Sequence, residues 1–460
     1  MFGVKARHAV IGLVVAMVAA IAAPVTASAA VTMATGTLPD GATYLIEVPS
    51  SWNGTLLLYS HGYVPLGSPN PARDVANGDL ATHAYLLANG FALAGSSYAH
   101  TGWALKEAIP DQLKTLDAFE AQVGTPTRTI AWGHSLGGII TAGLLQRAPA
   151  RFTAALPMCG VLAGGVATWN QALDAAFAIQ KLLAGDSGLQ VVNIANPLSN
   201  FFTALTVVGN AQKTPEGRAR IALAGALGDL PGWFDPASPE PAATDYAIQE
   251  ANQYLWNVNP DDFFLFAARA ELESRAGGNP SWNTGVNYTK QLSNSIDLAE
   301  VQALYQQAGL SLDADLATLN NAPRISANPA SVDYLTQNIV FNGELGGKPV
   351  LTMHTTGDGL VVNTDEQAYR SVVNEAGNGP LLREVFVHRA GHCKFTPAET
   401  VAALQALISR LDTGHWAGVT DTDTLNASAT ALGPLMNVAP ASFISFEPAQ
   451  FLRPFDSGAH

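Results

Sequence analysis

The chain has 460 residues, of which 48% are hydrophobic and 13% charged, and its formal net charge is −14. Such a chain can bury a large core, which excludes a mostly disordered protein. The excess of acidic groups argues against nucleic acid and anionic membrane surfaces as partners.

The N-terminus has the pattern of an export signal. Lys5 and Arg7 precede an apolar run over 9–25, and small residues follow at Ala27-Ser28-Ala29. This predicts a signal peptide over 1–29 and a secreted protein, extracellular or periplasmic. A membrane anchor is the alternative interpretation. No later run is long and apolar enough to span a bilayer, so we expect no stable membrane insertion after cleavage.

From residue 30 to residue 160, strand and helix patterns alternate. The pattern predicts strands at 31–38, 42–48, 55–60, 91–98, 128–132 and 152–158, and helices at 80–88 and 104–123. Such alternation is typical of an α/β fold, in which helices cover both faces of a mostly parallel sheet. Active groups in such sheets gather beyond the carboxyl ends of the strands.

The alternation stops over 161–347, where helices are predicted instead, and resumes over 348–411. We interpret 161–347 as a helical cap inserted into the α/β core, and 412–460 as an extension that packs on the body. The cap contains many aromatic residues, which either form its core or line an apolar pocket: Phe201, Phe202, Trp233, Trp256, Phe263, Phe264, Phe266 and Trp282.

Two helix starts in the second core segment carry capping patterns. Thr364 and Gln367 have the spacing of a capping box. Thr396 is a predicted N-cap, followed by Pro397 at the first helical position.

The strongest motif is Gly133-His134-Ser135-Leu136-Gly137, which lies between a predicted strand and a predicted helix. This is the context of a nucleophile elbow, a tight turn that lifts a serine hydroxyl above the sheet. The glycines at 133 and 137 leave room for the turn, and Gly138 lets the helix lie close to the sheet. The alternative is a structural serine in a glycine-rich turn.

Two later loops carry partners for such a serine. Asp358 follows the strand at 348–354, and His392 lies between the last strand and the last helix. A histidine is needed because a serine hydroxyl is a poor nucleophile at neutral pH, and an acid would hold the imidazole in the correct tautomer. Asp365 is the main rival for the acid, and the rivals of His392 are His61, His134, His354 and His388.

The order Ser135, Asp358, His392, together with His61-Gly62, Gly357-Asp358-Gly359 and Ala390-Gly391-His392, resembles the α/β-hydrolases of the lipase and esterase type. The resemblance covers about 31–160 and 346–411. It implies the α/β-hydrolase fold and a serine hydrolase activity. It also implies an oxyanion hole, formed by the backbone N–H groups of Leu136 and Tyr63.

The two cysteines, Cys159 and Cys393, are both expected at this edge of the sheet, because one ends the strand after the nucleophile helix and the other adjoins His392. We predict a disulfide between them; two buried free thiols are the alternative. A disulfide beside the catalytic residues is similar to that of the tannase and feruloyl-esterase family. The match is partial, since His134 and not a cysteine precedes Ser135.

No metal site and no cofactor are expected. Asp421-Thr422-Asp423 lacks the glycine and distal glutamate of a calcium loop. The leading hypothesis is hydrolysis of a carboxylic ester, either a small molecule or a polymer, through an acyl-enzyme. An amidase or aminopeptidase with the same residues is the alternative, with Asp261-Asp262 and Glu271/Glu273 as candidate groups for a substrate N-terminus. A non-catalytic binding protein is the third hypothesis.

Overall fold

The computed structural model describes residues 30–261 and 263–453, and the predicted signal peptide at 1–29 lies outside them. Within these residues a nine-stranded sheet has the order β1-β2-β4-β3-β5-β6-β7-β8-β9. Its strands are β1 (Val31–Thr37), β2 (Thr43–Pro49), β3 (Thr55–Ser60), β4 (Ala92–Ser96), β5 (Arg128–His134), β6 (Ala154–Met158), β7 (Val350–Gly357), β8 (Leu382–Ala390) and β9 (Phe443–Ile444). The strands β3 to β8 pair in parallel, and antiparallel pairs are confined to the two edges.

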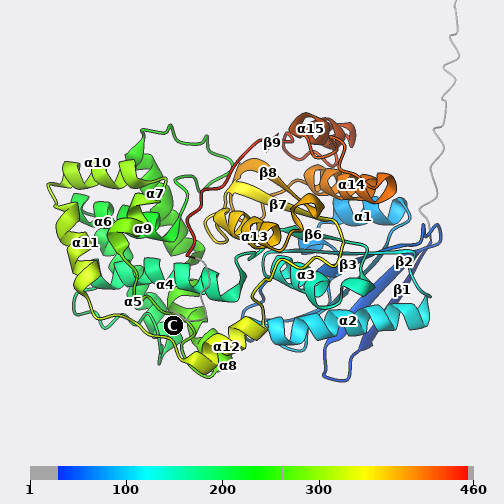
Figure 1. The fold of residues 1–460 in the computed structure, drawn as a ribbon, viewed down its shortest axis with the longest axis horizontal. Helices are drawn as coiled ribbons and strands as arrows, with labels where there is room; N and C mark the ends of the chain where they lie inside the picture. The colour runs from blue at the N-terminus through cyan, green and yellow to red at the C-terminus, as the bar shows by residue number, and fades with distance from the viewer. Residues whose placement is uncertain (1–29, 262, 454–460) are drawn as a thin grey trace, which may run out of the picture.

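Helices cover both faces of this sheet (Figure 1). On one face lie α1 (Leu80–Ala88), α14 (Pro397–Thr413) and α15 (Thr422–Ala431), and on the other lie α2 (Leu105–Gln122), α3 (Leu136–Arg147) and α13 (Thr364–Glu375). Short 3-10 turns η1 (Ala76–Gly78), η2 (Pro149–Arg151) and η5 (Gly379–Leu381) connect elements. Because the central strands are covered on both sides, β3 is buried along its whole length. The α/β fold predicted from the alternating pattern is confirmed.

The segment between β6 and β7 forms a helical lobe beside the sheet, which we call the cap (Figure 1). Its elements are α4 (Gly164–Leu182), α5 (Pro197–Ala211), α6 (Pro215–Gly228), α7 (Tyr246–Trp256), the π-helical turns η3 (Asn257–Asp261) and η4 (Phe264–Ala268), α8 (Arg269–Ala276), α9 (Tyr288–Ser293), α10 (Leu298–Ala308), α11 (Leu312–Asn321) and α12 (Pro329–Gln337). The cap has an apolar core of its own around α4 and α6.

Ion pairs and close packing attach the cap to the sheet domain. Arg275 of α8 pairs with Glu107 of α2 at 3.0 Å, and Glu271 accepts a hydrogen bond from the backbone of Trp103 at 3.0 Å. The indole of Trp256 lies against Gly359, where a side chain would collide with the ring. These contacts fix the cap above the carboxyl ends of the strands.

The C-terminal segment returns to the body. β9 pairs with β8, and Phe451 and Leu452 pack on Val362. Arg453 donates from Nε to Asp174 Oδ2 of α4 at 2.9 Å. In Figure 1 this segment, in red, runs from β9 across to the cap. The tail therefore contacts both lobes.

The two capping predictions have different outcomes. Thr396 caps α14 and forms a reciprocal capping box with Glu399, with Pro397 at the first helical position. The predicted box at Thr364 is wrong, because the N-cap of α13 is Asn363 and Thr364 is already the first residue of the helix. The hydroxyl of Thr364 instead donates to Asp229 of the cap at 2.7 Å, so a tertiary contact replaces the local one.

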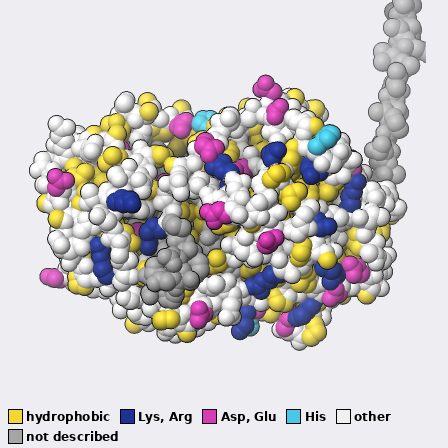
Figure 2. Space-filling view, viewed as in Figure 1, with side chains coloured by type: hydrophobic (Ala, Val, Ile, Leu, Met, Phe, Trp, Pro, Cys, Tyr) yellow, Lys and Arg dark blue, Asp and Glu magenta, His cyan; other side chains and the backbone are white. Residues whose placement is uncertain are grey.

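The surface is mixed in charge on the face drawn in Figure 2, where acidic and basic side chains are interspersed rather than gathered into one patch. Among residues 30–261 and 263–453, no helix has both the length and the apolar character needed to cross a membrane.

Two carboxyl groups are buried in the cap between α7 and α10. Glu250 and Glu300 are 1% and 2% exposed. Burial raises the pKa of Glu250 to about 7. Burial, together with the nearby Asp297 and Glu250, raises the pKa of Glu300 to about 9. Gln253 donates to Glu300 at 3.1 Å, and this contact only partly offsets the effect.

A carboxyl group whose pKa is raised by folding binds more protons in the folded state than in the unfolded state. The free energy of unfolding therefore decreases as pH rises from the pKa of the unfolded state, about 4.3 for glutamate, toward the pKa of the folded state. We therefore expect the Tm to fall between about pH 5 and pH 8. Glu300→Gln keeps an acceptor for Gln253 and should flatten this decrease. Thermal unfolding measured across the range tests this, with the exposed Glu216→Gln as control; equal slopes in the two variants would contradict it.

Candidate active site

Ser135 lies in a strained turn between β5 and α3. Its φ of 59° and ψ of −123° fall in a region that residues with side chains rarely adopt. A Cβ on Gly133 would lie 2.5 Å from the carbonyl oxygen of Ser60, and one on Gly137 would collide with the same atom. A Cβ on Gly138 would collide with Gly160. The glycines thus allow the elbow that the motif predicts, and the turn places Ser135 beyond the end of β5.

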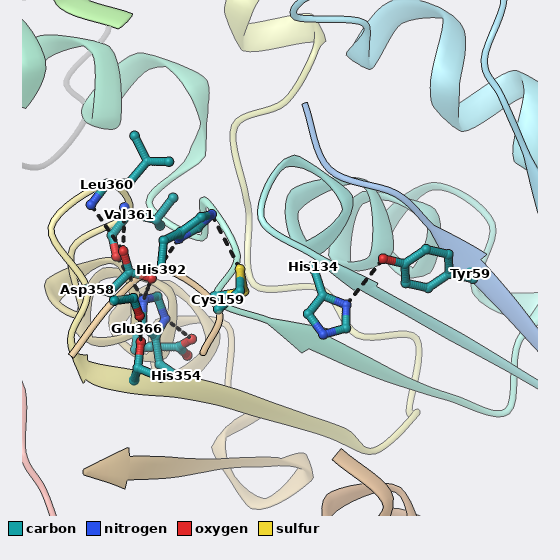
Figure 3. The surroundings of a disulfide bond; sticks show 12 residues. Tyr59, His134, Cys159, His354, Asp358, Leu360, Val361, Glu366 and His392 are labelled. Atoms are coloured by element: carbon teal, nitrogen blue, oxygen red, sulfur yellow. Dashed lines mark hydrogen bonds and ion pairs between the residues drawn. A yellow bond between two sulfur atoms is a disulfide. The ribbon is translucent and has the colours of Figure 1, made fainter. Parts of the chain in front are cut away.

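Asp358 and His392 follow β7 and β8 and contact each other. His392 Nδ1 donates to Asp358 Oδ2 at 2.7 Å (Figure 3). The other oxygen, Oδ1, accepts from the backbone N–H groups of Leu360 and Val361, both at 3.1 Å. Burial alone would raise the pKa of Asp358, but His392 and His354 hold it well below its ordinary value. Asp358 is therefore an ionised carboxylate with partners on both oxygens.

The structure brings Ser135 and His392 to the same hollow, which Gly62, Tyr63 and Leu360 also line. No hydrogen bond joins their side chains in the part of the chain that the structure describes. Nε2 of His392 instead lies 3.3 Å from Sγ of Cys393. Asp358 therefore holds the imidazole at its Nδ1 side, and the nitrogen on the other side faces the sulfur of Cys393.

The loop after β3 lies against Ser135, as the oxyanion-hole prediction requires. A Cβ on Gly62 would be 3.5 Å from Cβ of Ser135. His61 holds this loop, with Nδ1 2.7 Å from Gly62 O and Nε2 3.1 Å from Ser97 O. Its ring also stacks on Tyr98 at 4.0 Å. His61 is thus a structural residue of the loop rather than a partner of Ser135.

Two backbone N–H groups are available near Ser135, those of Tyr63 and Leu136. Leu136 opens α3, where the first N–H groups of a helix have no partner within the helix. Within residues 30–261 and 263–453, neither amide donates a backbone hydrogen bond. Both remain candidates for binding a negatively charged oxygen.

The disulfide between Cys159 and Cys393 is present, which confirms that prediction. Its sulfur atoms lie beside the ring of His392 (Figure 3). It joins the end of β6, where the chain enters the cap, to the loop that carries His392. The bond therefore restrains the histidine loop from the side opposite Asp358.

His354 and Glu366 form a second layer behind Asp358 that sequence reasoning missed. His354, weighed only as a rival base, is fully buried on β7, and its Nε2 lies 3.6 Å from Asp358 Oδ2 and 2.9 Å from Val361 O. Its Nδ1 is 3.0 Å from Glu366 Oε1 of α13. The feature of the sequence that could have indicated this layer is that His354 precedes Asp358 by four residues.

The charges in this layer explain its protonation. Burial would lower the pKa of His354, but its contacts with Asp358 and Glu366 raise it to about 10. The ring is therefore an imidazolium at neutral pH. It places a buried positive charge behind Asp358, and Figure 3 shows the two histidines on either side of that carboxylate.

The other rival residues have different partners. Asp365 accepts from Ala163 N at 2.9 Å and Thr168 Oγ1 at 3.1 Å, so it joins α13 to the start of the cap. His134 is buried beside Tyr59, and burial lowers its pKa to about 3. His388 lies against the ring of Trp233 at 5.2 Å, and its side chain, 39% exposed, pairs with Glu240 of the cap at 3.3 Å.

A second hollow, of about 750 Å³ including its opening, extends from Ser135 beneath the cap. Aromatic rings from the sheet domain and the cap line it. Trp103 and Trp169 meet edge to face at 5.5 Å, and Tyr63 and Phe264 do so at 5.1 Å. Of the cap aromatics left unassigned by the sequence, Phe264 lines this hollow, whereas Phe266 and Trp282 lie in cores. We call this hollow the acyl pocket, for the group that we propose binds there.

The comparison with known proteins gives a family. No family model matches the chain. The chain is 32% identical over 433 residues to the o-phthalyl amidase of Xanthobacter agilis, an alignment that covers 86% of this chain and 90% of the relative. The chain belongs to the family of this amidase. It is a hydrolase, and its sheet and elbow are those of the α/β-hydrolases.

Several of the solved structures to which the chain is similar are esterases. An esterase from Aspergillus oryzae matches 81% of this chain and 77% of its own, at 14% identity and a TM-score of 0.42. Feruloyl esterase B from Aspergillus oryzae matches 84% and 81%, at 13% identity and a TM-score of 0.41. The Pyrococcus furiosus esterase Pf2001 matches 83% and 91%, at 12% identity and a TM-score of 0.37. Likenesses this remote do not identify a substrate.

We expect His354→Gln to lower kcat by roughly 10- to 100-fold, since a hydrogen bond to a charged group contributes about 1.5–3 kcal/mol. KM should stay within about twofold, because His354 does not line the acyl pocket. The paired variant His354→Gln/Glu366→Gln removes both buried charges and controls for loss of stability. Steady-state kinetics together with the Tm decides, and an unchanged kcat in both folded variants would contradict the role.

Removal of the disulfide should loosen the histidine loop. Cys159→Ala/Cys393→Ala is expected to lower the free energy of unfolding by about 2–4 kcal/mol and to reduce kcat, because His392 loses a restraint. Wild-type protein treated with a phosphine reductant should behave alike. If the double variant keeps the wild-type Tm and kcat, the disulfide has neither effect.

Proposed function

We propose that the protein is a serine hydrolase in which Ser135, His392 and Asp358 form a catalytic triad. The observation that carries the proposal is the 2.7 Å hydrogen bond between His392 and the buried Asp358, on a hollow that Ser135 also lines. An acid, an imidazole and a strained serine at one sheet edge are the parts that acyl transfer needs.

In the proposed mechanism, Nε2 of His392 takes the proton of Ser135 Oγ while the oxygen attacks the substrate carbonyl. Because Nε2 now faces the disulfide, the ring turns toward the serine when substrate fills the hollow, as catalytic hydrogen bonds often tighten only in the complex. The N–H groups of Leu136 and Tyr63 bind the oxyanion. His392 then protonates the leaving group, and water releases the acyl group from Ser135.

We propose that the acyl group is flat and aromatic. The acyl pocket begins at Ser135, and the rings of Trp103, Trp169 and Phe264 form its walls. Rings packed edge to face present large, rigid apolar surfaces, which suit a planar group better than a flexible chain. The name of the Xanthobacter agilis relative specifies an o-phthalyl group, which is a benzene ring with neighbouring carbonyls. That name supports the same assignment.

For the bond cleaved, we propose an amide, with esters as the second candidate. An ester is the leading hypothesis from the sequence, and the same acyl-enzyme route serves both bonds. The relative's name supports the amide. An aminopeptidase has less support, because Glu271 accepts from Trp103 N, and Glu273 accepts from Asn193 N and Ile194 N. These glutamates are engaged and do not line the acyl pocket, whereas Asp261 does line it and is the group that an aminopeptidase hypothesis would still use; Asp262 lies outside the described residues.

We also propose that the mature protein is exported, with 1–29 removed as a signal peptide. The Cys159–Cys393 disulfide supports this, because disulfides persist in oxidising compartments.

Ser135→Ala should reduce hydrolysis of benzoyl and 2-carboxybenzoyl p-nitroanilides by roughly 10⁴-fold or more, because the nucleophile is lost. Matched p-nitrophenyl esters and acetyl p-nitroanilide complete the substrate panel. Ser199→Ala, at an exposed serine of α5, is the control and should keep full activity.

Each outcome distinguishes one candidate. Retained activity in Ser135→Ala would refute the triad, and turnover of esters alone would replace the amide proposal. Equal turnover of acetyl and benzoyl substrates would refute the aromatic acyl group. If a fluorophosphonate labels neither the wild type nor Ser199→Ala and no substrate reacts, the protein is a non-catalytic binding protein.

A further inference from the structure

A cluster of three titratable side chains lies outside the proposed catalytic site, at the edge of the sheet. Glu47 is on β2, His83 is on α1, and Asp74 is in the loop that joins β3 to η1. None of them lines the hollows beside Ser135. The three residues are 27 and 9 positions apart and match no metal-binding motif, so only the fold brings them together.

The three side chains converge on one point. One ligand atom from each, a carboxylate oxygen of Glu47 and Asp74 and a ring nitrogen of His83, lies within 4.8 Å of the other two. His83 Nε2 is 2.5 Å from Glu47 Oε2. Glu47 and Asp74 are each 4% exposed, whereas the side chain of His83 is 27% exposed. The cluster is buried on its carboxylate side and reachable past the imidazole.

An oxygen without an N–H donor points to a missing ligand. Oδ2 of Asp74 is buried and accepts from no N–H group among residues 30–261 and 263–453, and the Asp74 side chain is hydrogen-bonded instead with the neighbouring carboxyl of Glu47. Within the same residues, no lysine or arginine forms a hydrogen bond or ion pair with Glu47 or Asp74. A buried acceptor without a donor is costly, so such a group in a native structure calls for an explanation.

The ligand set favours a cation. Two buried carboxyl groups lie beside one imidazole, and burial together with a hydrogen bond with Glu47 raises the pKa of Asp74 to about 8. A divalent ion among the three groups would displace the proton that the two carboxyl groups share and would bind Oδ2 of Asp74. One imidazole with two carboxylates suits Zn²⁺ or Mn²⁺. Ca²⁺ and Mg²⁺ take oxygen ligands, and thiolates, which would select softer ions, are missing from the cluster.

We propose that Glu47, Asp74 and His83 bind a divalent transition-metal ion, Zn²⁺ or Mn²⁺, with water completing the coordination on the side of His83. The ion fastens the loop over residues 61–79 to β2 and α1. That loop begins with His61, Gly62 and Tyr63 beside Ser135. The site is structural, and its metal affinity does not depend on the proposed hydrolytic function.

The loop is already closely packed at this place, which makes a fastening ion effective. A side chain at Gly95 of β4 would collide with the carbonyl oxygen of Arg73, next to Asp74. Asn70 Nδ2 donates to Ser97 O at 2.5 Å. Little movement of Asp74 is therefore needed to reach the ion, and binding costs little ordering entropy.

The test uses the full untagged protein after dialysis against EDTA. Calorimetric titration with Zn²⁺, and separately with Mn²⁺, should show one ion bound per chain. The Tm should also rise when the ion is added, because the ion binds to the folded state. Asp74→Asn and His83→Gln should each weaken binding at least tenfold. His388→Gln removes an exposed histidine that also pairs with a glutamate, and it should bind like the wild type.

X-ray absorption of the wild-type zinc complex decides the ligands without relying on any variant. We expect one imidazole nitrogen and otherwise oxygen neighbours, with no sulfur. Absence of stoichiometric binding to the wild type would overturn the proposal and leave a cluster held by hydrogen bonds alone. Binding that is unchanged in both Asp74→Asn and His83→Gln would also overturn it, as would a spectrum with two or more imidazoles. Failure of the Ser135 experiment would leave these results unaffected.

Discussion

The arrangement of the site depends on one buried carboxylate. Asp358 is removed from water, and an unpaired charge there would be very unfavourable. Two histidines and two backbone amides share its oxygens, and these groups come from three parts of the fold. His392 lies in the loop after β8, His354 lies on β7, and both amides belong to the turn that leads to α13. The need to pair this charge therefore fixes the relative positions of these pieces.

The pairing extends into a row of alternating acidic and basic side chains. Glu366 contacts the positively charged His354, which lies behind the ionised Asp358, and His392 comes next, on the hollow that Ser135 also lines. A histidine flanked by two acids stays protonated, so Asp358 keeps a positive neighbour at its back. Such fixed charges are already in place before any substrate arrives, which is the condition under which electrostatic stabilisation costs no reorganisation.

Much of this was predictable from the sequence because it rests on local rules. Ser135 needs glycines at 133 and 137 to pass the carbonyl of Ser60, and strand ends in a parallel sheet meet at one edge, which placed Asp358, His392 and both cysteines together. Contacts that form only when the cap packs on the sheet domain could not be predicted from such local rules. Thr364 bonds to Asp229 across the lobes, and Phe264 turns into the pocket while Phe266 turns away from it.

The course of the tail has a consequence for how molecules enter and leave. The chain passes between the sheet domain and the cap after β6 and before β7, and again where Phe451 to Arg453 reach α4 and end in the Arg453–Asp174 pair. Several polar contacts also join the two lobes, among them the Arg275–Glu107 and His388–Glu240 pairs and the Thr364–Asp229 hydrogen bond. Lifting the cap from the sheet domain would break all of these contacts together. Molecules are therefore expected to reach Ser135 through the existing hollows, whose width limits the size of molecule that can be turned over.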